Sequence, residues 1–238
     1  MKAIAFAVLV ALIAPSASAA NAPPTLHKAP NLAKNAEAFP TLVGATPAIA
    51  RINRTLQAAN AKQRDDMKDC RRDAPQDGYW WEQSVDAPLI GAYFLSLWVH
   101  GNLSCGGAHP NFVDQALTFD LTTGEPVDWR RLLPVSLRGA PGDAIGSPGL
   151  TALFVEQSTK EGVGADCQEA FGEQQMNFAF WPDAKAKGLA MRAANLLHWA
   201  EGPCSGPVTI PVATLKRLGF DNQLVADIEA GRHQESDP

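Results

Sequence analysis

Hydrophobic positions first recur at helical spacing, after a short non-periodic stretch. Ile49, Ile52 and Leu56 follow one another three or four residues apart, and Thr46-Pro47 supplies a capping residue with a proline at the first helical position. We expect a long helix that buries this face and ends near Cys70.

From Tyr79 the hydrophobic period changes to two. Segments rich in aromatic and β-branched residues predict strands over 79–85, 92–99 and 112–121, arranged as an antiparallel meander. Shorter helices and strands follow up to residue 230. This order predicts an α+β fold, in which an antiparallel β-sheet packs with a long N-terminal helix and shorter C-terminal helices.

The first residues read as a targeting segment. Lys2 precedes an apolar run that is too short to span a bilayer, and Ala17-Ser18-Ala19 matches a cleavage site. We divide the chain into a signal peptide (1–19), a flexible leader (20–37), one domain (38–230) and a disordered tail (231–238). Cleavage near Ala19 predicts a periplasmic or secreted protein without a membrane span.

Charge narrows the range of partners. The formal net charge is −5, and losing Lys2 makes the mature chain more acidic. Lysines and arginines form no long run, so we do not expect nucleic acid or anionic lipid as partners, whereas a cationic protein would be attracted. The chain is long enough to bury its own core, and we expect a monomer without a cofactor.

Four cysteines, Cys70, Cys105, Cys167 and Cys204, lie in the predicted mature chain. In an oxidising compartment two disulfides are the default, and three pairings are possible. We favour Cys70–Cys105 and Cys167–Cys204, since each joins neighbouring elements. A metal site is not expected, because the sequence has no C-x-x-C pair and no histidine at ligand spacing from a cysteine pair.

Two histidines offer the sharpest chemical hypothesis. His100 and His109 flank a predicted turn, and Asp114 or Asp120 could complete a metal site or a small hydrolase centre. The sequence lacks H-E-x-x-H and G-x-S-x-G motifs. We therefore favour a structural role for His109, in which its ring bonds the backbone of the turn. Trp80 and Trp81 point to opposite faces of a strand, so one of them could be exposed for glycan stacking while the other fills the core.

The run Gly106-Gly107-Ala108-His109-Pro110-Asn111, followed by the strand with Phe119-Asp120-Leu121, resembles a bacterial extracytoplasmic domain of unknown function. That domain is shared by RsiV-type anti-sigma factors and PdaC-type peptidoglycan deacetylases. The resemblance implies a recognition domain whose motif residues are Gly106, Gly107, His109, Pro110 and Asn111, and in RsiV-like proteins it implies lysozyme binding.

These observations together favour a secreted or periplasmic, non-catalytic binding module of the cell envelope. Its expected partner is an envelope protein, with a lysozyme-like hydrolase as one candidate, or peptidoglycan. The alternative is a small envelope hydrolase that uses His100, His109 and a nearby aspartate such as Asp114.

Overall fold

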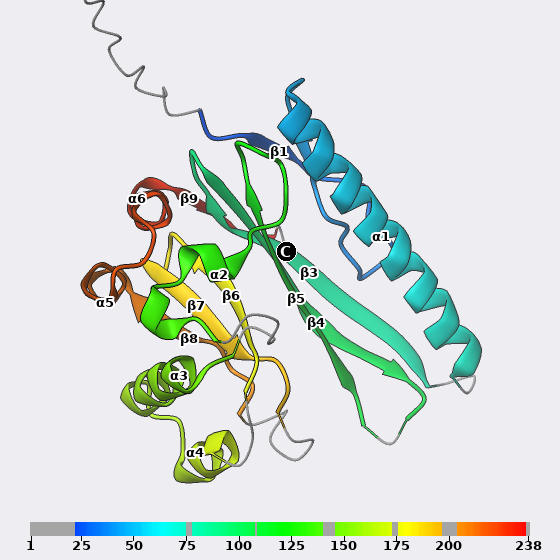
Figure 1. Ribbon diagram of the computed structural model, residues 1–238. Coiled ribbons are helices and arrows are strands. Elements are labelled where there is room, and N and C mark those ends of the chain that lie inside the picture. Colours follow the sequence, from blue (N-terminus) through cyan, green and yellow to red (C-terminus); the bar gives the residue numbers. More distant parts are fainter. Residues whose placement is uncertain are drawn as a thin grey trace, which may run out of the picture.

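The computed structural model describes residues 22–74, 78–107, 109–139, 146–172, 176–196 and 204–236, and within them it has an α+β fold with three antiparallel sheets (Figure 1). The largest sheet has the strand order β5-β4-β3-β9, and the others are β6-β7-β8 and β1-β2. The strands are β1 (Thr25–His27), β2 (Thr41–Val43), β3 (Tyr79–Ile90), β4 (Phe94–Cys105), β5 (Asn111–Asp120), β6 (Phe178–Asp183), β7 (Gly188–Ala193), β8 (Val208–Pro211) and β9 (Arg232–Gln234). The helices are α1 (Pro47–Asp73), α2 (Trp129–Leu132), η1 (Val135–Leu137), α3 (Pro148–Lys160), α4 (Ala165–Gly172), α5 (Val212–Leu218) and α6 (Asn222–Ala230).

Helix α1 is the long helix that the spacing predicts. The Thr46 hydroxyl accepts a hydrogen bond from the Ile49 N–H at 3.2 Å, which satisfies one of the free donors at the helix start. Ile52 and Leu56 are buried in a cluster with Leu95 of β4. Figure 1 shows α1 running along one side of β3, β4 and β5, while α3 to α6 and the small sheet β6-β7-β8 lie on the other side.

The alternation of side chains along β4 explains the two cores. Leu95, Leu97 and Val99 point toward α1 and belong to the cluster beneath that helix. Phe94, one position out of phase, belongs to a second cluster with β6, β7 and the C-terminal helices. The large sheet therefore has an α1 side and a second side. Odd-numbered residues face α1 on β4, on β5 and on β3 as far as Ala87; beyond the irregularity in β3, Ile90 faces α1 and Leu89 faces the second side.

Two segments predicted to lack structure are ordered in part, which corrects those predictions. Within the predicted leader, Thr25–His27 forms β1 and Ala36 is buried. Within the predicted tail, β9 pairs with β3. Neither segment has an apolar period. Backbone hydrogen bonds to a neighbouring strand hold each of them. The predicted signal peptide, residues 1–19, lies outside the described residues.

Disulfides join Cys70 to Cys105 and Cys167 to Cys204, the two pairs favoured from the sequence. The first ties the last turns of α1 to the end of β4, so the far end of the hairpin is fixed to the helix. Among the helices described, none combines the length and the apolar character that a membrane span requires.

Candidate functional site: an open face of the large sheet

The second side of the large sheet, which faces away from α1, is covered over only part of its length. Where β6 packs on it, Ser96 and Thr118 are buried and Trp98 stacks on Trp181, with ring centroids 5.2 Å apart. Toward the other end of the same strands, the side chains of this side are exposed. We call this surface the open face; its residues are Trp80, Glu82, Asn102 and Phe112.

Contacts on the α1 side determine which residues form the open face. The Arg71 guanidinium of α1 lies over the Tyr79 ring, 5.8 Å from its centroid. Gln83 is buried and donates a hydrogen bond to Gln63 of α1 at 3.2 Å. Because side chains alternate along a strand, Trp80 and Glu82 then point away from the helix.

The open face carries two large aromatic side chains in an otherwise polar surface. Trp80 is 39% exposed and Phe112 is 53% exposed. Trp80 lies opposite Ser104, and Phe112 lies opposite Asn102 on the other side of β4. From standard strand spacing and rise, their Cα atoms are about 12 Å apart. Glu82, Asn102 and Phe112 form one row across β3, β4 and β5, so hydrogen-bonding groups lie beside both apolar platforms.

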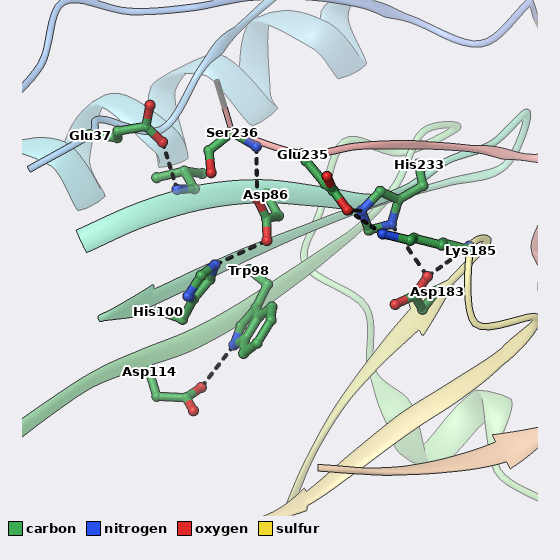
Figure 2. Close-up of polar contacts among 11 residues, drawn as sticks. Glu37, Asp86, Trp98, His100, Asp114, Asp183, Lys185, His233, Glu235 and Ser236 are labelled. Carbon is green, nitrogen blue, oxygen red and sulfur yellow. Dashed lines mark hydrogen bonds and ion pairs between the residues drawn. The ribbon is translucent and has the colours of Figure 1, made fainter. Parts of the chain in front are cut away.

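His100 lies at the boundary between the covered and open parts of this side. Its Nε2 is 3.0 Å from Asp86 Oδ2, and its ring stacks on Trp98 with centroids 4.2 Å apart (Figure 2). The other Asp86 oxygen accepts the Ser236 N–H at 2.8 Å. The His100 ring is therefore fixed by both a carboxylate and an aromatic neighbour, while its side chain stays 36% exposed.

These contacts shift the ionisation of the pair. The hydrogen bond to Asp86 raises the pKa of His100 above its ordinary value of 6.5, although partial burial opposes this. Burial raises the pKa of Asp86, but hydrogen bonds from His100 and Ser236, with the charge of His100, outweigh it and leave the pKa below 3.8. A protonated His100 beside an ionised Asp86 is favoured in weak acid.

Asp114 belongs to a neighbouring ion pair. It accepts a hydrogen bond from Trp98 Nε1 at 3.1 Å and lies 2.7 Å from the Arg192 guanidinium of β7. Burial raises the pKa of Asp114, although Arg192 and Trp98 favour its ionised form. Arg192 also donates to the Ser205 carbonyl at 2.8 Å, so this pair connects the small sheet to β5.

The structure does not assemble the predicted hydrolase set of His100, His109 and Asp114. His100 and Asp114 are opposite in the β4–β5 register, but His100 bonds Asp86 and Asp114 bonds Trp98. His109 is exposed in the turn beyond the Leu103–Asn111 pair that ends this register. Among the described residues, no group of three or more potential ligands could hold a metal ion.

The glycine-rich turn that carries the family resemblance is an exposed connection between β4 and β5. Gly106 has φ 83°, in the left-handed region that favours glycine, and its N–H donates to Ser104 Oγ at 3.4 Å. Gly107, His109, Pro110 and Asn111 are exposed, and Ala108 lies outside the described residues. The binding role of these motif residues stays a prediction.

Sequence reasoning did not find the partners of His100. The Asp86–His100 contact depends on the hairpin register, which places Asp86 opposite Trp98 and two pairs along from His100, on the same side of the sheet. Ser236 and Arg192 arrive from elements far away in the chain. A correct β3–β4 register was the one sequence-level signal that could have identified Asp86.

Comparison with solved structures identifies the fold. A member of the DUF3298 family from Bacteroides fragilis superposes with a TM-score of 0.55 at 16% identity, covering 87% of this chain and 95% of that one. A DUF3298 family protein from Pseudomonas aeruginosa aligns with a TM-score of 0.38 at 15% identity, covering 60% of this chain and 64% of that one. No family model matches the sequence, and no curated protein matches it either. The first likeness shows a fold shared with a domain of unknown function.

Proposed function

We propose that this protein is a secreted or periplasmic binding module of the cell envelope, without catalytic activity of its own, and that it binds peptidoglycan through the open face. The observation that carries the proposal is the pair of exposed aromatic side chains, Trp80 and Phe112, on a rigid sheet. Sugar rings present apolar faces and hydroxyl edges, and an aromatic platform beside amide and carboxylate groups complements both.

The rigidity of the surface supports a recognition role. The open face belongs to long, paired strands, and the disulfide Cys70–Cys105 fixes their far end to α1. A surface that is already ordered loses little conformational entropy on binding. The fold likeness to a DUF3298 protein and the resemblance to RsiV-type and PdaC-type domains are compatible with an envelope module, and the two disulfides fit an oxidising compartment.

A cationic envelope protein, such as a lysozyme-like hydrolase, is the second candidate. The net charge of −5 favours it, since an acidic protein attracts basic partners over long range. Such binding would weaken steeply as salt screens the charges, whereas stacking of a neutral glycan on aromatic rings would not.

Co-sedimentation with purified, insoluble peptidoglycan tests the proposal. We expect the mature protein to sediment with it, and the double substitution Trp80→Ala with Phe112→Ala to weaken binding by about tenfold, because two stacking contacts are lost. Val135→Ala is the matched control, since Val135 is 77% exposed and lies on η1, outside the open face. It should bind like the unmodified protein.

The salt dependence separates the two candidates. The cationic partner would be favoured if the protein retained lysozyme at low salt but not at high salt, and did not bind protein-free peptidoglycan. Equal sedimentation of the double variant and the unmodified protein would reject the open face as the binding surface.

A further inference from the structure

Residues 232–236 form a short strap along the edge of β3 (Figures 1 and 2). The strap comprises β9 together with Glu235 and Ser236. Its backbone pairs with β3 in two places, Gln234 with Ala87 and Arg232 with Ile90, and the register is irregular between them. The Ser236 N–H extends this edge contact by donating to Asp86 at 2.8 Å.

Side-chain contacts of the strap are ionic and differ in exposure, since His233 and Asp183 are only 17% and 19% exposed. Glu235 pairs with Lys185, and the two side chains are 60% and 66% exposed. His233 Nδ1 lies 3.3 Å from Asp183 Oδ1, an ion-pair distance without the alignment of a hydrogen bond. No residue of the strap has an apolar side chain. Exposed ion pairs contribute little, because water and salt compete for both partners, so the Glu235–Lys185 pair adds little to the attachment of the strap.

A small cavity lies beneath the strap on the α1 side of β3. It has a volume of about 60 Å³, and its walls are mixed. Leu26, Val85, Ala87 and Leu97 form an apolar part, and the Lys28–Glu37 ion pair and the strap residues Gln234 to Ser236 form a polar part. Directly paired residues of neighbouring strands share a face, so the Gln234 side chain points to the same side as Ala87. An apolar side chain at the position of Gln234 would complement the apolar part of this cavity, which Val85, Ala87 and Leu97 form, better than the amide does.

Beside the cavity, on the other side of the strap, two opposite charges lie at the end of β6 and in the turn that follows it. Asp183 accepts the N–H of Lys185 at 2.8 Å, which holds the turn, and both side chains face the strap. Asp183 lies opposite the position of His233, and Lys185 lies opposite the position of Glu235. Asp183 and Lys185 therefore complement an extended segment that has a basic residue at the position of His233 and an acidic residue at the position of Glu235.

We propose that the edge of β3 from Asp86 to Ile90 is a strand-addition site, which the strap occupies within the chain and which an extended segment of a partner protein occupies when it displaces the strap. That segment carries a basic residue, an apolar residue and an acidic residue at the positions of His233, Gln234 and Glu235. The apolar residue fills the cavity, and the two charged residues pair with Asp183 and Lys185. This site is separate from the open face and does not depend on the function proposed for it.

Fluorescence anisotropy with labelled peptides tests the site on the full chain. The probes are Gly-Arg-Lys-Leu-Glu-Ser, which has the proposed pattern, and Gly-Arg-Lys-Leu-Lys-Ser, which reverses one charge. Ser236→Pro loosens the strap, because proline has no N–H to donate to Asp86. We expect the first peptide to bind the Ser236→Pro protein at least fivefold more tightly than it binds the unmodified protein. The Ser236→Pro protein should also bind the first peptide more tightly than the second.

Charge reversal identifies where the peptide lies. In the Ser236→Pro background, Lys185→Glu should invert the preference, so that the second peptide binds more tightly. Lys160→Glu on α3 makes the same change of charge at a side chain 57% exposed and should leave the preference unchanged. Absence of binding, equal affinity for the unmodified and Ser236→Pro proteins, or a preference that Lys185→Glu does not invert would each overturn the proposal. Circular dichroism of each variant confirms that it is folded.

Discussion

Asp227 on α6 provides the strictest test of how the C-terminal elements hold the β3–β4 hairpin. Its side chain is buried and accepts hydrogen bonds from the backbone N–H groups of Ala92, Tyr93 and Phe94 at 3.0, 2.7 and 2.7 Å. Asp227→Ala leaves these three donors without their partner. Each lost bond of this kind costs about 1–3 kcal/mol, and water entering the space recovers part, so we expect a loss of about 4 kcal/mol.

Urea denaturation followed by fluorescence measures this loss as a lower midpoint. Asp227→Asn keeps one acceptor oxygen and should lose about 2 kcal/mol. Asp66→Ala on α1 is the control, since this side chain is 47% exposed in an ion pair with Lys62, and the expected change is below about 0.5 kcal/mol. A loss below about 1 kcal/mol for Asp227→Ala would refute the reasoning, because it would mean that the turn does not depend on these bonds.

Two further predictions concern the elements around the open face. Replacing both Cys70 and Cys105 by serine releases a cross-link over a sequence separation of 35, and chain entropy predicts a loss of about 4 kcal/mol in the free energy of unfolding; a loss below about 1 kcal/mol would contradict this account. The pKa of His100 is raised above 6.5, so the stabilisation by its contact with Asp86 is complete below pH 6.5 and is lost as the pH rises through the raised pKa. The unmodified protein should therefore exceed His100→Gln in stability most at about pH 5, and progressively less above neutrality; a pH-independent difference between them would show that the pair does not titrate as described.

The sequence predicts those helices and strands in which buried apolar residues recur at a regular spacing. Helix α1 and strands β3 to β5 follow from the spacing of residues such as Ile52 and Leu56, because one face of each element packs against a core. Strands β1 and β9 could not be found in this way. They contribute few buried side chains, and backbone hydrogen bonds to another strand hold them, which no periodicity records.

The site was predictable only in its residue types. Side-chain alternation along a strand predicts that Trp80 and Trp81 point to opposite faces. In the structure Trp80 is exposed on the open face. The partner of His100 depends on the register of the hairpin, where an irregularity between Asp86 and Leu89 shifts the pairing. Contacts from Ser236 and Arg192 require the tertiary fold, because these residues are distant in the chain.

The measurement that most directly tests binding through the open face is nuclear magnetic resonance of the tryptophan indole N–H groups during titration with soluble peptidoglycan fragments. Trp80 is 39% exposed and Trp181 is 2% exposed, so one protein contains both the reporter and its control. We predict that the Trp80 signal shifts in proportion to occupancy while the Trp181 signal stays in place. Saturable binding of the fragments with an unchanged Trp80 signal would contradict the proposed function.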